Sequence, residues 1–422
     1  MSSWLGRRWK WFIRAPLLRV VWGLVMLVVL VVNAVSFVWR TMRRTRVPNK
    51  FAVDVIENKA RQGQEEFEDK FHREVIELVL PSLLQSEMKH FVPAVNFSEF
   101  LLRKLRVERT LRENSPLNAC SQKVFIVGLP RTGSTFLHQL CALDPNCRTV
   151  RAWEFRNPPK FNESIQERQA KINKVQALLS GFYKIAPAIK DIHYIEALDA
   201  DECVQGFMDC AVPDWYLWGA VAADEAFAWY VDHDMSRGYA NYAKFLKTLP
   251  VQANEQCMWL KSPHHTFKLP EIAKTFPGSK FVWLHRERVE NSVASCCSMN
   301  QAILDATCPW YVNERELGER TLKRMSKCVK KAMQDRELLE SQGVVFVDIK
   351  YAEFKRDPVR ELRGLYGKLG MEFGAEFESR LGDLLLAEKR TSTPKHQYDL
   401  KDFDLSQQQV ADEFAEYNAR FF

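Results

Sequence analysis

The sequence lacks several features that would place it in common classes of protein. Its ten cysteines are scattered, and none forms a C-x₂-C pair with a matching second pair, which argues against a zinc site. It contains no zinc-finger, RRM or helix-turn-helix pattern, and its net charge of +7 is modest, so nucleic acid is not an expected partner. Internal repeats and low-complexity stretches are also missing, so neither a solenoid nor a long biased tail is expected.

Charged residues are missing from Val20 to Val38, although the whole chain has an ordinary globular composition, with 46% hydrophobic and 27% charged residues. At 1.5 Å per residue, a helix over this run is about 28 Å long, enough to cross the apolar core of a bilayer. The run has no small-residue cleavage site and ends at Trp39 and Arg40. We therefore predict an uncleaved transmembrane anchor rather than a signal peptide or a buried helix.

The two sides of this anchor do not differ in charge. Five Lys or Arg residues lie within residues 1–19 and five within 40–50, so the positive-inside rule gives no orientation. Sequons at Asn96 and Asn162 would need the lumen, but two is about the number expected by chance. The 422 residues are expected to divide into a basic tail at 1–19, a transmembrane anchor at 20–38, a helical lead-in at 39–118 and a catalytic domain at 119–422.

The most informative stretch is Val124 to Leu140. Its first four residues are apolar and run into Gly128, and apolar residues at helical spacing begin at Phe136. This pattern predicts a buried parallel strand, a tight turn and the N-terminus of a helix. Free backbone N–H groups and the positive end of the helix dipole converge at such a turn, which predicts an anion site, most often for phosphate.

The turn resembles a nucleotide-binding P-loop except at one position. Gly128 and Gly133 have the P-loop spacing, but Ser134 stands where that loop carries its Lys. A cation lies inside the turn instead, at Arg131, and a planar guanidinium suits paired phosphate or sulfate oxygens. We therefore expect the anion cradle without the magnesium-nucleotide chemistry.

Three further strands are predicted at Cys257–Leu260, Phe281–Leu284 and Val344–Asp348. Lys261 follows the first of these strands and Arg286 follows the second. Because ligands lie beyond the carboxyl ends of strands in open α/β sheets, these polar residues are expected in one site. The predicted fold is α/β and P-loop-like, with three layers in which helices flank a central parallel sheet, preceded by the transmembrane helix.

Two helical segments add candidate residues. The helix expected at Val289–Met299 carries Ser292 and Ser295 three residues apart on one face. Just beyond the first turn, Glu154 stands between aromatic residues, which makes it a candidate general base, although a surface salt bridge is the plainer reading. Residues 165–255 are helical in pattern and rich in aromatics, which fits an acceptor pocket or an ordinary core.

Together these motifs resemble those of sulfotransferases that use 3′-phosphoadenosine-5′-phosphosulfate (PAPS), in particular the large, mostly bacterial-type family. The resemblance covers roughly residues 120 to 420 and is specific because it involves several separate motifs. These motifs are the loop GLPRTGST from Gly128 to Thr135, the stretch LKSPHH from Leu260 to His265, FPGSK from Phe276 before His285 and Arg286, YAEF from Tyr351, and HQYDL from His396.

The resemblance implies transfer of a sulfuryl group from PAPS to a hydroxyl or amine acceptor, without a metal. Arg286 and a serine on the following helix would hold the 3′-phosphate, and Lys261 would stabilise the bridging oxygen of the leaving group. The family serine falls on Ala294 here, so Ser292 or Ser295 would replace it. The residues that would hold the 5′-phosphosulfate are Arg131, Thr132, Gly133, Ser134 and Thr135.

The resemblance leaves two candidates for the general base. Tyrosylprotein and some carbohydrate sulfotransferases use a glutamate followed by an arginine, which Glu154 and Arg156 resemble. Cytosolic sulfotransferases use a histidine after the Lys-bearing strand, which His265 or its neighbour His264 resembles. Glu154 is preferred because the flanking aromatic residues would desolvate it and raise its pKa, while Arg156 would orient it.

Two other functions compete with this reading. A P-loop kinase would need magnesium and a Lys at the position of Ser134. An inactive membrane-tethered scaffold would be expected to have lost Arg131 or Lys261, and both are present. The acceptor can be a glycan, a lipid, a protein or a small molecule. The resemblance favours a single-pass Golgi protein with a lumenal catalytic domain.

Overall fold

The computed structural model of this protein describes residues 53–61, 66–77, 97–113, 120–160, 162–207, 223–307, 313–390 and 398–422. By its internal contacts the chain divides into two compact units, Met1–Asn58 and Lys59–Phe422, and the second contains the whole sheet. The predicted anchor at 20–38 lies outside the described residues, so it stays a prediction. Among the residues that are described, no helix is long and apolar enough to cross a membrane.

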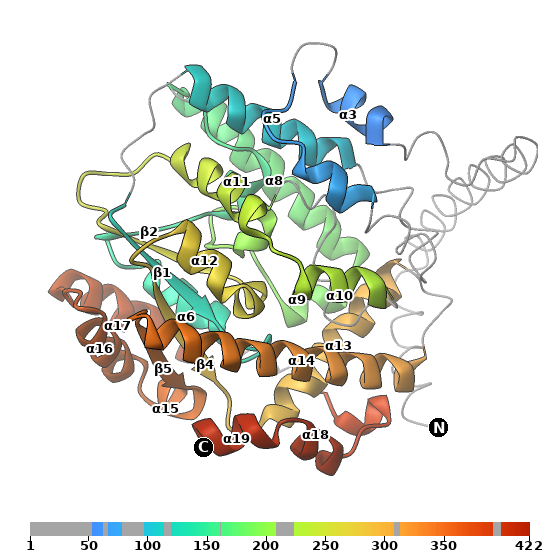
Figure 1. Ribbon diagram of the computed structural model, residues 1–422. Coiled ribbons are helices and arrows are strands. Elements are labelled where there is room, and N and C mark those ends of the chain that lie inside the picture. The colour runs from blue at the N-terminus through green and yellow to red at the C-terminus, as the bar shows by residue number, and fades with distance from the viewer. Residues whose placement is uncertain are drawn as a thin grey trace, which may run out of the picture. The chain divides into compact units, whose positions relative to one another are not determined.

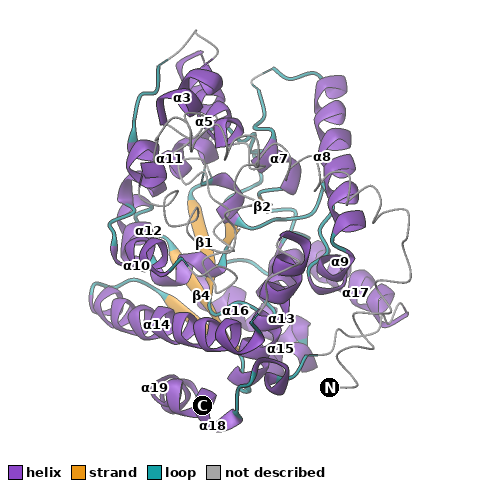
Figure 2. Ribbon diagram, turned by 90° about the vertical axis from the view of Figure 1, so that its right-hand side faces the viewer, coloured by secondary structure: helices purple, strands orange, loops and turns teal. Residues whose placement is uncertain are grey.

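The core of the larger unit is a five-stranded sheet in which every neighbouring pair of strands is parallel, as predicted. The spatial order is β2-β3-β1-β4-β5, so β1 lies at the centre. Figure 2 shows the strands enclosed by helices. The strands are β1 Gln122–Val127, β2 Cys147–Thr149, β3 Cys257–Lys261, β4 Lys280–His285 and β5 Phe346–Lys350.

The strand β1 explains why helices cover both faces of the sheet. Its side chains alternate between the faces, as the pleat of a strand requires. Val124 and Ile126 join an apolar cluster with residues of α6, α15, α16 and α17. Phe125 points to the other face, where its ring lies 5.3 Å from that of Phe276. Because both faces are buried, the strands β1, β3 and β4 read as nearly continuous apolar runs.

The helices of the described residues fall before, between and after the strands (Figure 1). Those in the first half are α3 Val53–Arg61, α5 Phe97–Glu113, α6 Ser134–Cys141, α7 Ala152–Arg156, α8 Ile165–Ile185, α9 Pro187–Ile192, α10 Asp224–Asp232 and α11 Ser236–Lys247. Those in the second half are α12 Leu269–Thr275, α13 Val289–Thr307, α14 Glu314–Ser341, α15 Tyr351–Arg356, α16 Pro358–Leu369, α17 Ala375–Arg390, α18 Gln407–Glu413 and α19 Ala415–Phe421. The same described residues also contain the 3₁₀ turns η4 Cys203–Gly206, η6 Pro263–Phe267 and η7 Leu400–Phe403.

Part of the predicted lead-in, including α5, belongs to the sheet-bearing unit. The helix α5 contacts α11, and Asp69 lies between these helices. Its carboxylate accepts hydrogen bonds from Arg237 and from Asn241, the latter at 2.8 Å. Lys104 donates to the Asp69 carbonyl at 2.7 Å. These bonds hold the segment near Asp69 and α5 against the helical layer over the sheet.

Candidate active site

The turn after β1 has the backbone geometry of an anion-binding loop. Gly128, Arg131 and Gly133 all have positive φ angles, of 128°, 67° and 95°. Alternation between right- and left-handed residues curves the chain so that its N–H groups line a concave surface. Gly133 is also the N-cap of α6, whose dipole adds positive potential at the same place. We call Gly128–Thr135 the donor loop.

The two glycines of the donor loop are required by close packing as well as by backbone angle. A Cβ atom on Gly128 would lie 2.7 Å from the carbonyl oxygen of Leu284 on the neighbouring strand. A Cβ atom on Gly133 would lie 2.7 Å from Cε2 of Tyr351, the first residue of α15. Any side chain at either position would therefore displace the loop from the sheet edge or from Tyr351.

One arginine of the site lies within the donor loop, and a second contacts the loop from the end of β4. Arg286 follows β4, donates from Nη1 to the carbonyl oxygen of Arg131 at 2.8 Å, and lies over the Tyr351 ring at 5.2 Å. Arg131 itself donates from Nε to Oγ of Ser295 at 3.0 Å. Ser292, one turn earlier on α13, is buried, and its Oγ atom has no hydrogen-bond partner among the described residues. The structure thus brings Arg286 and Ser295, two of the predicted residues, into contact with Arg131.

Lys261 connects the donor loop to a carboxylate. It ends β3 beside Ile126 of β1, and it is only 1% exposed. Its Nζ atom donates to Oγ1 of Thr135 at 3.1 Å and to Oε1 of Glu202 at 2.7 Å. The resulting ion pair lies at the carboxyl edge of the sheet, where ligands bind in this class of fold.

Neighbouring charges lower the pKa of the Glu202 carboxyl group strongly. Burial alone would raise the pKa of its carboxyl group, but Lys261 and then His193 oppose this, and together they lower the pKa to about 2. His193 Nε2 lies 4.0 Å from Oε1 of Glu202. Glu202 is therefore ionised at neutral pH and paired with Lys261. Sequence analysis missed it because it stands in a loop, although the acidic run Asp199-Ala-Asp-Glu202 was a visible signal.

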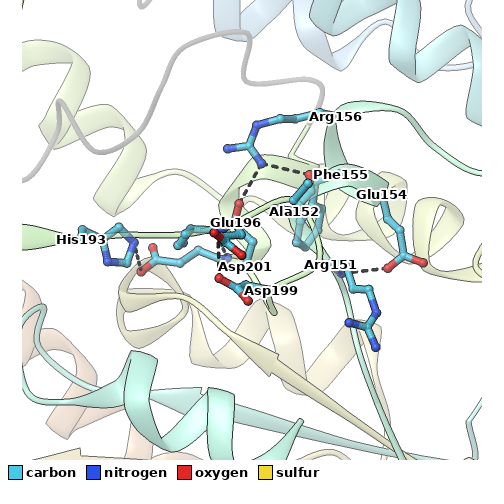
Figure 3. A network of polar contacts seen from close by, with 12 residues as sticks. Arg151, Ala152, Glu154, Phe155, Arg156, His193, Glu196, Asp199 and Asp201 are labelled. Atoms are coloured by element: carbon cyan, nitrogen blue, oxygen red, sulfur yellow. Dashed lines mark hydrogen bonds and ion pairs between the residues drawn. The ribbon is translucent and has the colours of Figure 1, made fainter. Parts of the chain in front are cut away.

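Glu154, the preferred base, has both carboxylate oxygens engaged in the fold. Oε2 accepts the backbone N–H of Arg151 at 2.8 Å, which caps α7, and Oε1 accepts from Arg148. Figure 3 shows Glu154 turned toward Arg151, on the opposite side of the polar network from His193. Its role as a base stays a prediction. The hydrogen bonds that hold Glu154 in the fold offer a different explanation for this residue.

Arg156 does not orient Glu154. Its Nη1 atom donates to Oδ2 of Asp201 at 2.8 Å and to the Ala152 carbonyl oxygen at 3.0 Å (Figure 3). Residues two apart on a helix point in different directions, so Arg156 and Glu154 of α7 find separate partners. Arg156 ties α7 to the segment that carries Glu202.

His265, the alternative base, lies deep in aromatic packing. It is 0% exposed, its Nδ1 atom is 2.9 Å from the Tyr239 hydroxyl, and its ring meets the Phe125 ring edge-on. Burial lowers the pKa of His265 to about 3, so the imidazole is neutral. The neighbouring His264 is also buried, with its ring edge toward Phe267. The catalytic role of His265 also stays a prediction.

Comparison with known proteins identifies the family. A sequence model of the sulfotransferase family matches residues 123–375, more than half of the chain. This chain belongs to the sulfotransferase family. No curated protein has a sequence that matches it. This assignment confirms, at the level of the family, the resemblance predicted from the separate motifs.

Solved structures of bacterial sulfotransferases share this fold, and two of them are from Mycobacterium species. Sulfotransferase STF1 from Mycobacterium tuberculosis superposes with a TM-score of 0.73 and 21% identity, covering 86% of this chain and 98% of its own. Sulfotransferase STF9 from Mycobacterium avium gives a TM-score of 0.75 and 21% identity, covering 89% of this chain and 98% of its own. At this identity the likeness establishes the shared fold, and the residue roles must be argued from this chain.

Proposed function

We propose that this sulfotransferase moves a sulfuryl group from PAPS to a hydroxyl group of its acceptor. The observation that carries the proposal is the position of Lys261, whose ammonium contacts both Thr135 of the donor loop and Glu202. A cation, an anion-binding turn and a carboxylate thus meet at one sheet edge. These are the groups that a transfer with an anionic leaving group needs.

The arrangement of cations suits a donor with two separate anionic groups. The donor loop, with its positive-φ residues and the N-terminus of α6, would hold the 5′-phosphosulfate. Arg286, together with Ser295 or Ser292 of α13, would hold the 3′-phosphate. The Oγ atom of Ser292 is buried and has no hydrogen-bond partner within the described part of the chain, which supports a hydrogen-bonding ligand there, because buried hydroxyl groups ordinarily have a partner.

In the proposed reaction the acceptor oxygen attacks sulfur, and the bond from sulfur to the bridging oxygen of PAPS breaks. The electron pair of that bond stays on the leaving adenosine 3′,5′-bisphosphate. Lys261 would offset the negative charge that develops there, in a site where burial strengthens the interaction. The acceptor hydroxyl loses its proton to a base as the new bond forms.

We propose Glu202 as that base because it is the carboxylate in direct contact with Lys261. While the pair is intact, the low pKa of Glu202 makes it a weak base. Once Lys261 turns to the donor oxygen, Glu202 loses its main cationic neighbour, and burial then raises its pKa. The base would thus gain strength when the donor is bound. Glu154 and His265 remain the alternative proposals.

The remaining proposals rest on sequence alone. The apolar run at 20–38 would anchor the protein in the Golgi membrane with its catalytic unit in the lumen. A lumenal site would favour a glycan, lipid or protein acceptor.

The test of the proposed function is calorimetric titration of the purified protein with adenosine 3′,5′-bisphosphate in EDTA. Binding is expected without metal and is expected to weaken at least tenfold in Arg286→Ala, since a bond to a charged group is lost. Mass spectrometry with labelled PAPS would then identify the sulfated acceptor. Tight binding of ATP that requires magnesium, with no binding of the bisphosphate, would replace this proposal by the kinase reading.

A further inference from the structure

The segment from Tyr398 to the last residue contacts the end of β4 through two tyrosines. The Tyr398 hydroxyl accepts a hydrogen bond from Nη2 of Arg286 at 3.1 Å. The Tyr417 hydroxyl lies 2.9 Å from Nδ1 of His285, the preceding residue. Two consecutive residues beside the donor loop are therefore held by one segment. The sequence motif that includes Tyr398 gave no role for this residue.

The C-terminal segment is firmly packed, so its tyrosines are fixed in place. The Phe421 ring stacks on the His285 ring with centroids 4.0 Å apart. His285 in turn bonds to Asp348 at 2.7 Å, and Arg336 holds Asp348 through two bonds of 2.6 and 2.9 Å. Figure 1 shows α18 and α19, in red, beside α14, which they contact.

The start of the segment, near Tyr398, is anchored as well. Leu400 and Phe403 of η7 are both buried, and η7 packs against α13 and α14. At Gly318 of α14 the contact is close: a Cβ atom there would lie 2.5 Å from the Phe403 carbonyl oxygen. The Tyr398 hydroxyl is thus presented to Arg286 from a fixed platform rather than from a loose chain end.

We propose that Tyr398 is a positioning residue that aims Arg286 and so sets the preference of the site for a nucleotide with a 3′-phosphate. This inference rests on the proposed function, in which Arg286 holds that phosphate. The guanidinium is held by the Arg131 carbonyl through Nη1, by the Tyr351 ring below, and by Tyr398 through Nη2.

Removing the Tyr398 hydroxyl would take away one of these three restraints. A guanidinium has five N–H donors in a rigid planar fork, so a small rotation misdirects all of them at once. The interaction with a 3′-phosphate would suffer, because it depends on the direction of the fork. A nucleotide without that phosphate makes no use of Arg286 in this scheme, so its affinity would not change.

The test compares adenosine 3′,5′-bisphosphate with adenosine 5′-monophosphate by calorimetry on the full chain. Tyr398→Phe is expected to lower the affinity for the bisphosphate about tenfold or more, in line with the loss of one hydrogen bond to a charged group, and to leave the affinity for the monophosphate within twofold. Tyr366→Phe is the matched control, since it removes a buried hydroxyl bonded to Asp144 at 2.9 Å on a different part of the sheet unit. Tyr366→Phe is expected to change the thermal stability but not the affinity for either nucleotide.

A double-mutant cycle separates positioning from direct contact. In the Arg286→Ala background, Tyr398→Phe is expected to cause no further loss of bisphosphate affinity, because its effect passes through Arg286. A further loss there, or an equal loss for both nucleotides in Tyr398→Phe, overturns the inference. A wild-type protein that does not prefer the bisphosphate overturns the proposed function itself, whatever Tyr398→Phe does. Should Tyr398→Phe fold poorly, Tyr398→His, which keeps a hydrogen-bond acceptor, is expected to retain more of the preference than Tyr398→Leu.

Discussion

The Nζ atom of Lys261 lies between two oxygens, 2.7 Å from Oε1 of Glu202 and 3.1 Å from Oγ1 of Thr135. The lysine therefore has two hydrogen-bond partners, Thr135 in the donor loop and the carboxylate of Glu202. A charge that arrives at the loop will compete with Glu202 for the same ammonium. This competition would couple the state of the carboxylate to occupancy of the loop.

Replacing Lys261 by Met should remove the charge that we propose stabilises the leaving group. Turnover is expected to fall by about 10²- to 10³-fold, the usual cost of one electrostatic donor. Affinity for adenosine 3′,5′-bisphosphate, measured by calorimetry, should change much less. The matched control is Lys268→Met, another lysine that is 1% exposed but bonds to the His233 carbonyl and to Glu271. It should lower the melting temperature and spare turnover of the folded protein.

Glu202→Gln should distinguish the proposed base from a structural ion-pair partner. Loss of a general base typically costs about 10²- to 10⁴-fold in rate. Single-turnover rates with saturating PAPS would measure this loss, while donor affinity is expected to hold or improve because Lys261 is released. An active Glu202→Gln enzyme would remove Glu202 from this role.

Glu154→Gln and His265→Ala complete the comparison of bases. Glu154→Gln loses an ion pair with Arg148 and weakens the cap of α7, so unfolding free energy should fall by about 1–3 kcal/mol with turnover within tenfold. Denaturant titration and initial rates give both quantities. Inactivity of folded Glu154→Gln alone would restore it as the base, and inactivity of His265→Ala alone would assign the histidine.

Gly133→Ala should damage the donor loop through strain and collision together. Its φ of 95° disfavours any side chain, and the new Cβ would lie 2.7 Å from Tyr351. Bisphosphate affinity is expected to fall at least tenfold. Gly278→Ala is the control, because Gly278 has a φ of 77° but no atom within 4 Å of an added Cβ. It should cost about 1–2 kcal/mol of stability from strain alone and leave affinity unchanged.

Stability should depend on pH through Glu108 of α5. This carboxyl is 1% exposed, and burial raises its pKa to about 7, although Lys104 acts in the opposite direction. Between pH 4.5 and 7 the folded state therefore binds more protons than the unfolded state, so stability falls as pH rises through this window. Glu108→Gln should raise the melting temperature at pH 8 by about 2 °C or more and give no gain at pH 5. Glu113→Gln, an exposed site on the same helix, should show no such pH dependence.

The membrane topology proposed from the apolar run at 20–38 can be tested in sealed microsomes. If the catalytic unit faces the lumen, added protease should leave it intact until detergent opens the membrane. Cleavage in the absence of detergent would place the unit in the cytosol. An antibody to a cytosolic epitope on the same membranes controls for protease activity.

The sequence predicted the parts of the fold that rest on long apolar runs. Strands β1, β3 and β4 are such runs, and all three were located. Strand β2 was missed because it has only three residues, one of them Arg148. Strand β5 starts two residues later than predicted because Gly343 turns the chain with a φ of 85° and Val344 still bonds to Leu339 at the end of α14.

The site was predictable where a residue lies at the carboxyl end of a strand, as Lys261 does at the end of β3 and Arg286 directly after β4. Glu202 and Tyr398 stand in segments without periodic pattern, and each meets a partner far away in the chain, Lys261 for the first and Arg286 for the second. No local rule pairs such residues. Glu154 shows the opposite problem, since its sequence neighbours suggested a desolvated base while its actual partners cap a helix.

The strand order also constrains how this chain reaches its fold. The central strand β1 pairs with β3 and β4, and both are synthesised later, after the whole stretch up to Cys257. At about 5–20 residues per second, β1 waits on the order of ten seconds for its first partner. During that time both edges of an apolar strand are unpaired, which favours pairing with other chains. Fragments that end before Cys257 should therefore aggregate, and folding of the full chain should depend on chaperones that cover β1 until β3 emerges.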